Sequence, residues 1–147
     1  MPINEVEVLL VEDSPEDREL ALLSFQRNHL ANNIQIARDG EEALDILFNR
    51  GEHANARPSR PKVILLDIKL PKVDGLEVLR AIKADERTKM IPVVVMTSSA
   101  EQKDMVESYR LGVNSYVQKP VDFAKFQEVM KQLGFYWLAI NKTPAPQ

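Results

Sequence analysis

Acidic, hydroxyl and basic side chains follow the apolar segments of this sequence at four separate places. Glu12 and Asp13 follow the first segment, Asp67 a later one, Thr97 the next, and Lys119 the last. Carboxylates act as nucleophiles and bind hard cations, and cationic and hydroxyl donors stabilise the charge of a transferred phosphoryl group. If folding brings these side chains together, Asp67 becomes the candidate nucleophile of a phosphoryl-transfer site.

The apolar segments predict the strands of a parallel sheet. They are rich in Val, Ile and Leu and lack polar alternation, which is typical of strands buried on both faces. Segments with helical periodicity alternate with them, which indicates βαβ units and a doubly wound α/β fold with helices on both faces. The carboxyl ends of parallel strands share one edge of the sheet, where ligands bind. We expect strands at about 7–11, 33–37, 63–66, 92–96 and 115–118, and helices that begin near residues 14, 39, 74, 100 and 122.

Three of the expected helix starts carry capping signals. Ser14 precedes a proline and two acidic residues, a common beginning of a first helical turn. The pairs Asp39 with Glu42 and Asp74 with Glu77 have the spacing of a capping box, in which each side chain accepts a backbone N–H of the other residue. These signals predict where the helices begin.

Glu12, Asp13 and Asp67 are expected to crowd at one point of the sheet edge. Like charges at such short distances repel one another and raise the pKa values of the carboxyl groups unless a cation lies among them. Oxygen ligands with room for water suit Mg²⁺. The absence of cysteine argues against a soft metal. Each residue also has a structural explanation, because Asp67 could accept backbone N–H bonds and Glu12 and Asp13 could favour the helix dipole. A raised pKa could also relieve the repulsion without a metal.

Lys119 and Thr97 complete the candidate site. Lys119 would supply positive charge, either as a plain salt bridge that neutralises the carboxylates or as a partner of the phosphoryl group. Thr97 would offer a hydroxyl, although it could instead cap the next helix, a task that Ser98 or Ser99 could also perform. Peptide bonds before proline adopt the cis form more readily than others, and the sequence leaves the isomer of the Lys119–Pro120 bond open.

Composition places limits on the function. The chain of 147 residues has the length of one domain and a net charge of -3, which argues against non-specific nucleic-acid binding. No apolar stretch approaches membrane-spanning length, and residues 1–5 lack the features of a signal peptide. We therefore expect a cytoplasmic protein that binds neither nucleic acid nor a membrane.

Taken in order, the motifs resemble the CheY-like receiver domain of bacterial response regulators, over about residues 6–133. The matching residues are Glu12-Asp13, Asp67 followed by Pro71 and Asp74-Gly75, Thr97, and Lys119-Pro120. The resemblance implies a flavodoxin-like, five-stranded parallel sheet with strand order 2-1-3-4-5, and a receiver domain that spans residues 1–133. It also implies that Asp67 accepts a phosphoryl group from the phosphohistidine of a sensor kinase.

The metal ligands of the family correspond to four positions of this sequence. The resemblance implies that Asp13 and Asp67 bind Mg²⁺ directly and that Glu12 acts through water. The backbone carbonyl of Lys69 would complete the protein ligands. The side chains of Lys69 and Ser99 flank the site, and equivalent positions tune the phosphate lifetime in the family.

The resemblance further implies a two-state switch. Thr97 would bond the phosphoryl group in the active state while Lys119 pairs with it. Tyr116 matches the family's switch aromatic, which turns inward when the threonine moves, although it could equally be an ordinary half-exposed strand aromatic. Phosphorylation adds roughly -1.5 to -2 charges, which would bias a bistable element formed by Thr97, Tyr116 and the helix at 100–111.

Two segments depart from a minimal receiver domain. The polar stretch 51–61 is long for a loop between a helix and a strand. The C-terminal extension, residues 134–147, is aromatic, and it either continues the helix that begins near residue 122 or folds back onto the domain. An exposed aromatic stripe would mark a homodimer interface. This interface would also include the face formed by the helix that begins near residue 100, the strand at 115–118 and the helix that begins near residue 122. Both segments resemble the small regulators that pair with bacterial phytochrome kinases, which implies a link to light signalling.

The sequence predicts a single-domain response regulator that switches protein contacts. Fewer than thirty residues follow Lys119, so we expect no output domain, and the domain would catalyse only its own phosphorylation and dephosphorylation. One alternative is a phosphorelay intermediate that passes the phosphate to a further histidine domain. Another is an aspartate-nucleophile phosphatase, although Lys69 occupies the position of the second Asp in such enzymes. A nucleotide- or flavin-binding domain lacks its glycine-rich motif here, and the intact set of functional residues disfavours a degenerate receiver that only dimerises.

Overall fold

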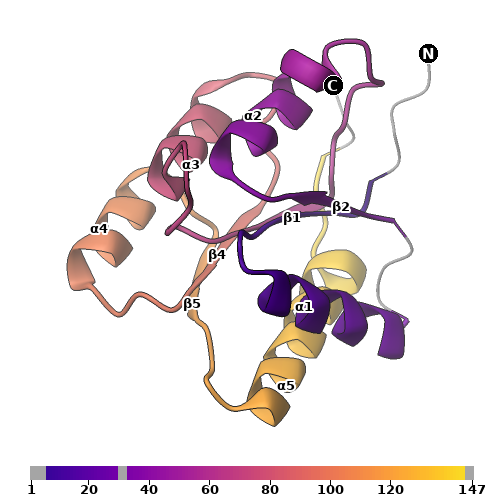
Figure 1. The fold of residues 1–147 in the computed structure, drawn as a ribbon, viewed down its shortest axis with the longest axis vertical. Coiled ribbons are helices and arrows are strands. Elements are labelled where there is room, and N and C mark those ends of the chain that lie inside the picture. Colours follow the sequence, from indigo (N-terminus) through magenta and orange to yellow (C-terminus); the bar gives the residue numbers. More distant parts are fainter. Residues whose placement is uncertain (1–5, 30–32, 145–147) are drawn as a thin grey trace.

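The computed structural model describes residues 6–29 and 33–144 (Figure 1). Residues 1–5, where we expect no signal peptide, lie outside this range, as do the last three residues of the 134–147 extension. No helix of the described residues is both long and apolar enough to cross a membrane.

Five parallel strands form one sheet in the order β2-β1-β3-β4-β5, which confirms the predicted fold class. The strands are β1 (Val8–Val11), β2 (Ile34–Ala37), β3 (Val63–Leu66), β4 (Val93–Thr97) and β5 (Ser115–Gln118). Val11 of β1 is level with Leu66 of β3, and Leu66 is level with Val95 of β4. The residues that follow β1 and β3, Glu12 and Asp67, therefore leave the sheet side by side.

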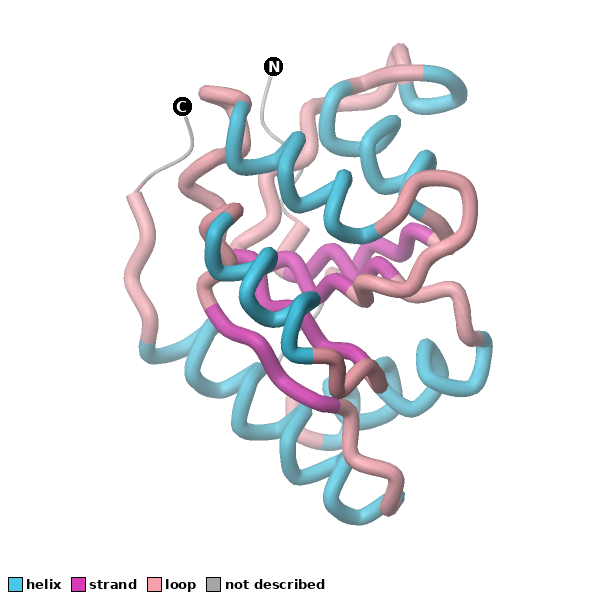
Figure 2. The backbone as a smooth tube through the Cα atoms, turned by 90° about the vertical axis from the view of Figure 1, so that its left-hand side faces the viewer, coloured by secondary structure: helices cyan, strands magenta, loops and turns pink. Residues whose placement is uncertain are grey.

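Helices cover both faces of the sheet, as Figure 2 shows from the side. One face is covered by α1 (Pro15–Arg27) and α5 (Phe123–Gly134), and the other by α2 (Gly40–Phe48), α3 (Gly75–Ala84) and α4 (Gln102–Arg110) (Figure 1). The long loop before β3 contains a single turn of 3-10 helix, η1 (Gly51–His53). Each helix lies where the sequence predicts one.

The uninterrupted apolar strands are explained by two cores, one under each helical layer. Successive side chains of a strand point to opposite faces, so both sets must be apolar. On the face of α2 and α3 the buried strand residues are Leu9, Val11, Ala37, Ile64, Leu66, Val93 and Val95. On the face of α1 and α5 they are Val8, Leu10, Val63, Leu65, Val94 and Met96.

Two of the three capping predictions agree with the structure. Ser14 accepts the N–H of Asp17 at 3.3 Å. Asp39 accepts the N–H of Glu42 at 2.8 Å, and the Glu42 carboxylate accepts the N–H of Arg38, one residue before the cap. These contacts fix the starts of α1 and α2.

The capping box predicted at Asp74 and Glu77 is wrong. Asp74 is the N-cap residue of α3, but its side chain makes no capping hydrogen bond with any of the described residues. The Glu77 carboxylate pairs instead with Arg80 at 3.5 Å. Close packing sets this helix start, because a Cβ on Gly75 would lie 2.4 Å from the carbonyl oxygen of Asp67. Only glycine allows α3 to begin directly against the end of β3.

After α5 the chain continues without a break into a π-helical segment, η2 (Phe135–Ile140). Trp137 and Leu138 pack against the core beneath α1 and α5. Three large apolar side chains of η2 are exposed: Phe135, Tyr136 and Ile140. The extension thus has one face toward its own domain and one toward solvent.

Candidate functional site

Glu12 and Asp67 extend the pairing of the sheet beyond the ends of β1 and β3. The N–H of Glu12 donates to the carbonyl of Ala37 at 3.0 Å, and the N–H of Asp67 donates to the carbonyl of Val11 at 3.1 Å. Both side chains are buried, whereas Asp13 is exposed. Carboxylate oxygens of Glu12, Asp13 and Asp67, which we call the acidic cluster, lie within 4.8 Å of one another. The structure thus brings together the three acids that the sequence pointed to.

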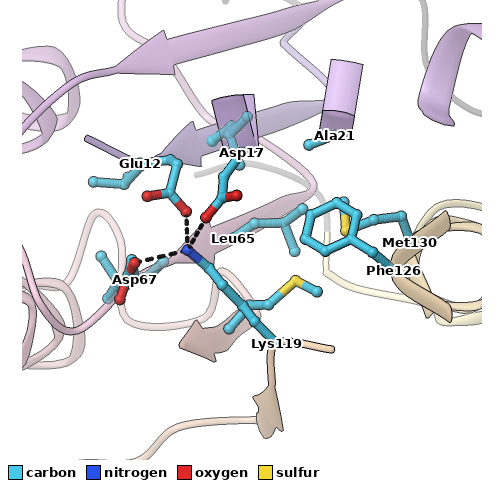
Figure 3. A pocket seen from close by; sticks show the side chains of 12 residues that line it. Glu12, Asp17, Ala21, Leu65, Asp67, Lys119, Phe126 and Met130 are labelled. Atoms are coloured by element: carbon cyan, nitrogen blue, oxygen red, sulfur yellow. Dashed lines mark hydrogen bonds and ion pairs between the residues drawn. The ribbon is translucent and has the colours of Figure 1, made fainter. Parts of the chain in front are cut away.

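Lys119 lies against this cluster and is almost fully buried (Figure 3). Its Nζ donates to Oε1 of Glu12, to Oδ2 of Asp17 at 2.8 Å and to Oδ2 of Asp67 at 2.9 Å. The backbone N–H of Lys119 donates to the carbonyl of Thr97 at 2.7 Å, which continues the pairing of β4 with β5. The peptide bond to Pro120 is trans, like every other peptide bond of the described residues.

Burial sets the electrostatics of the site. It raises the pKa of Glu12 to about 7, although the hydrogen bond from Lys119 opposes the rise. Burial alone would lower the pKa of Lys119, but the bonds to Asp17 and Glu12 and the charge of Asp67 raise it overall. The ammonium of Lys119 carries one positive charge, which cannot neutralise the carboxylates of the acidic cluster together with that of Asp17. The site therefore carries an excess of negative charge on hard oxygen donors. That donor set fits a divalent cation such as Mg²⁺.

Short hydrogen bonds orient the carboxylates and the turn that carries them. Nη1 of Arg18 donates to the carbonyls of Glu12 and Asp13, both at 3.0 Å. The N–H of Ser14 donates to Oε2 of Glu12 at 3.2 Å, and the N–H of Lys69 donates to Oδ1 of Asp67 at 3.0 Å. Each oxygen of Asp67 therefore has its own donor, one from Lys69 and one from Lys119.

Thr97 ends β4 and is fully buried. Its Oγ1 accepts the N–H of Ser99 at 3.1 Å. Ser99 in turn donates to Oδ2 of Asp104 at 2.8 Å and accepts the N–H of Glu101 at 3.3 Å, just ahead of α4. Ser98 is exposed. The hydroxyls thus link the end of β4 to the first turn of α4, and Ser99 supplies the local bond at the helix start.

The Lys69 side chain forms an ion pair with a residue of α4. Its Nζ is 3.3 Å from Oδ2 of Asp104, a buried carboxylate in α4. The hydrogen bond from Ser99 and the pairing with Lys69 lower the pKa of Asp104 despite its burial. This ion pair joins the loop after β3 to α4.

Tyr116 points into the protein. Its ring packs against the core beneath α2 and α3. Its hydroxyl is buried and has no hydrogen-bond partner among the described residues. Burial raises the pKa of this hydroxyl, and the charge of Asp104 adds to the rise. Tyr116 is half-buried, so its role as the family's switch aromatic stays a prediction.

Sequence reasoning missed Asp17 and Asp104, which contact the two lysines of the site. A signal existed for each. Asp17 lies four residues before the buried Ala21, and Asp104 lies four residues before the buried Ser108, so each shares the inner face of its helix. An acid on an inner helical face beside the edge of the sheet is a candidate partner for a buried cation.

The chain is similar to a known protein family and to several known proteins. A family model described as the response regulator receiver domain matches residues 8–131. The probable methanogenesis regulatory protein FilR2 of Methanothrix harundinacea is 41% identical over 139 residues, which cover 95% of this chain and 88% of that protein.

Two cyanobacterial response regulators are also similar. Response regulator Rcp1 of Synechocystis sp. is 38% identical over 138 residues, which cover 94% of this chain and 92% of Rcp1. The crystal structure of its Mn²⁺-bound form matches with a TM-score of 0.88 at 37% identity, over 97% of this chain and 100% of that one. The phosphorylated cyanobacterial phytochrome response regulator RcpA matches with the same TM-score, identity and coverage.

Proposed function

The chain belongs to the response regulator receiver domain family, and from this premise we propose that Asp67 is the residue that accepts the phosphoryl group. The observation that carries the proposal is the environment of Asp67. Its carboxylate lies at the end of β3, within the acidic cluster, and each oxygen is held by a different donor. Such an arrangement fixes a nucleophile and concentrates positive charge beside it.

The proposed donor is the phosphohistidine of a sensor kinase. An oxygen of Asp67 attacks phosphorus, the phosphorus–nitrogen bond to the histidine breaks, and an acyl phosphate forms. The ammonium of Lys119 pairs with the phosphoryl oxygens, and the hydroxyl of Thr97 donates to them in the active state. Attack of water on phosphorus would then break the phosphorus–oxygen bond to Asp67, release inorganic phosphate and return the free carboxylate. The domain would thereby promote its own phosphorylation and dephosphorylation without acting on other substrates.

The acidic cluster is the proposed Mg²⁺ site. Asp13 and Asp67 would bind the ion directly, Glu12 through water, and Lys69 through its backbone carbonyl. The closely spaced carboxylate oxygens support a cation here, as does the Mn²⁺ bound to the related Rcp1. When bound, the ion offsets the negative charge of the phosphoryl oxygens.

The proposed switch joins Thr97 to α4 and Tyr116. A phosphoryl group that captures the Thr97 hydroxyl would release the N–H of Ser99, and Ser99 is bonded to Asp104 of α4. The unpaired hydroxyl of Tyr116 lies in this same region and can gain a partner by moving. Phosphorylation would thereby change the surface of α4, β5 and α5.

The proposed kinase is a phytochrome, because RcpA is a phytochrome response regulator that this chain resembles over nearly its whole length. A phosphorelay intermediate remains the alternative use of the same site. Partner contacts or self-association would involve exposed apolar side chains of α4 and η2: Val106, Tyr109, Phe135, Tyr136 and Ile140. The expected cytoplasmic location belongs to this proposal as well.

Intact mass spectrometry after incubation with a small phosphodonor and Mg²⁺ tests the proposal. We expect the mass to rise by one phosphoryl group in the wild type and not at all in Asp67→Asn. Asp74→Asn is the matched control, because it removes a nearby carboxylate outside the acidic cluster and should keep the adduct. An adduct that persists in Asp67→Asn, or none in the wild type, would contradict the assignment.

Light scattering tests self-association. We expect phosphodonor to raise the molecular mass toward that of a dimer and Phe135→Ser to oppose this. Trp137 is a poor target because it packs inward. A monomeric mass with and without phosphodonor would exclude the dimer and leave the phosphoacceptor assignment intact.

A further inference from the structure

Asp17 holds Lys119 from α1, with its carboxylate beside that of Glu12 (Figure 3). Its Oδ2 lies 2.8 Å from Nζ of Lys119, comparable with the 2.9 Å bond to Asp67. The Asp17 side chain is 32% exposed, whereas that of Asp67 is 7% exposed. The ammonium therefore binds two buried carboxylates and one carboxylate that reaches solvent.

The ordinary role of an acid in a first helical turn does not explain this contact. Such acids favour the helix dipole or accept free N–H groups. Here the Ser14 hydroxyl accepts the N–H of Asp17, and the Asp17 carboxylate is bonded to Lys119. Glu16, on the same turn, is exposed and serves the dipole equally well. Asp17 instead lies on the inner face of α1, one turn before the buried Ala21.

Asp17 differs from the other two partners of Lys119 in what else it must do. Glu12 and Asp67 belong to the acidic cluster, whereas Asp17 is not one of its three members among the described residues. A divalent cation at the cluster draws on the same carboxylates that hold the ammonium. Asp17 is the one partner of Lys119 that such a cation leaves available.

We propose that Asp17 is a positioning residue that keeps Lys119 beside Asp67 while a divalent cation occupies the acidic cluster. This inference rests on the proposed function, which places the cation and the phosphoryl group there. With Asp17 present, the ammonium shifts its pairing toward Asp17 as the cation binds. Without it, Lys119 has only Glu12 and Asp67 to pair with and opposes the cation directly.

Isothermal titration calorimetry with Mg²⁺ alone tests this in a double-mutant cycle of Asp17→Asn and Lys119→Gln. We expect Asp17→Asn to raise the dissociation constant of Mg²⁺ about fivefold, the size of a coupling between contacting charged groups. In the Lys119→Gln background, the same substitution should have only the effect of a lost nearby charge. Glu16→Gln measures that effect, because it removes one charge from the same helical turn.

The outcomes separate this inference from the proposed function. A larger effect of Asp17→Asn than of Glu16→Gln, lost when Lys119 is absent, supports the positioning role. Equal effects in both backgrounds, or equal effects of the two charge removals, overturn it and leave the Mg²⁺ site intact. A wild type that binds no Mg²⁺ overturns the metal site and this inference together. Circular dichroism spectra that match the wild type show that each variant folds.

Discussion

The two lysines that donate hydrogen bonds to Asp67, Lys119 through its ammonium and Lys69 through its backbone N–H, differ in how their side chains are paired. Lys119 is only 11% exposed and is bonded to three carboxylates, whereas Lys69 is 53% exposed and pairs with one. In the pair of Lys69 with Asp104 it is the carboxylate that is buried, with 8% of its side chain exposed. Around Lys119 the cation is therefore buried, whereas in the pair of Lys69 with Asp104 the anion is buried.

The difference separates a fixed part of the site from an adjustable one. Lys119 extends from the end of β5 and ties α1 to the ends of β1 and β3, so its position depends on the core of the fold. Lys69 and Asp104 join a loop to the first turn of α4 through one partly exposed ion pair. Exposed ion pairs contribute little to stability, whereas removal of one partner from a buried pair is costly. The Lys69 pair can therefore open without unfolding the domain.

The largest expected effect follows the loss of Lys119. Lys119→Gln leaves Glu12, Asp17 and Asp67 without their shared counter-ion, so in EDTA the free energy of unfolding should fall by about 3 kcal/mol. Lys69→Gln should cost less than about 1 kcal/mol, because its pair is partly exposed. Urea unfolding followed by circular dichroism measures both. Similar losses in the two variants would contradict the contrast between the lysines. Added Mg²⁺ should narrow the difference, because the ion replaces the missing charge.

The pH dependence of stability should have opposite signs at Glu12 and at Asp104. The folded pKa of Glu12, about 7, lies above its ordinary value of 4.5. Between these values the folded metal-free protein holds a proton that the unfolded chain has released. Its stability should therefore fall as pH rises through this window, by up to about 1.4 kcal/mol per pH unit for one proton. Asp104, whose pKa is lowered, instead contributes stability that is lost as pH falls below its ordinary range.

Urea unfolding in EDTA between about pH 2 and pH 8 measures both trends, because the contribution of Asp104 is lost only below its ordinary pKa. Glu12→Gln should remove the fall of stability between about pH 4.5 and 7. Asp104→Asn should flatten the loss at the acidic end and leave the upper window unchanged. A wild type whose stability rises steadily from pH 5 to pH 7 would contradict the assignment of the raised pKa to Glu12.

A smaller effect is expected when the buried anion of the second pair is removed. Asp104→Ala leaves Lys69 and the hydroxyl of Ser99 without their shared partner, which should cost about 1 kcal/mol. Asp104→Asn keeps an acceptor for Ser99 and should cost less. Thermal unfolding compares these variants with Lys69→Gln. If Lys69→Gln lowered the free energy of unfolding more than Asp104→Ala, the exposed lysine would contribute more to stability than the buried carboxylate, which would contradict this prediction.

The contrast between the two sides also marks what the sequence could predict. β3 lies at its expected residues because an uninterrupted apolar run flanked by polar residues leaves little freedom of register. β5 also lies at its expected residues, although only Tyr116 and Val117 of its four residues are apolar. Those ends fix Asp67 and Lys119, so the centre of the site followed from strand prediction and from the family resemblance. Partners that reach the lysines from helices did not.

Asp17 and Asp104 looked like ordinary first-turn acids, because helix-dipole effects alone justify an acid at either position. Their roles depend on which helical face meets which strand end, a tertiary contact that local patterns do not encode. The capping box at Asp74 failed for a related reason, since the packing of Gly75 against Asp67 fixes that helix start. Local signals predicted elements, and close packing between elements decided the details.

The smallest expected effect concerns Tyr116, whose buried hydroxyl lies beside the adjustable side of the site without a partner. A buried polar group with no hydrogen bond costs free energy, so Tyr116→Phe should leave stability unchanged or raise it by less than about 1 kcal/mol. In the proposed switch, movement of Thr97 and Ser99 gives this hydroxyl a partner. Tyr116→Phe should therefore weaken the phosphodonor-dependent change in the exchange of α4 amide hydrogens, measured by mass spectrometry, while phosphorylation of Asp67 persists. A clear loss of stability would show that the hydroxyl is already bonded in the resting protein, and Tyr116 would then belong with Lys119 to the fixed part of the site.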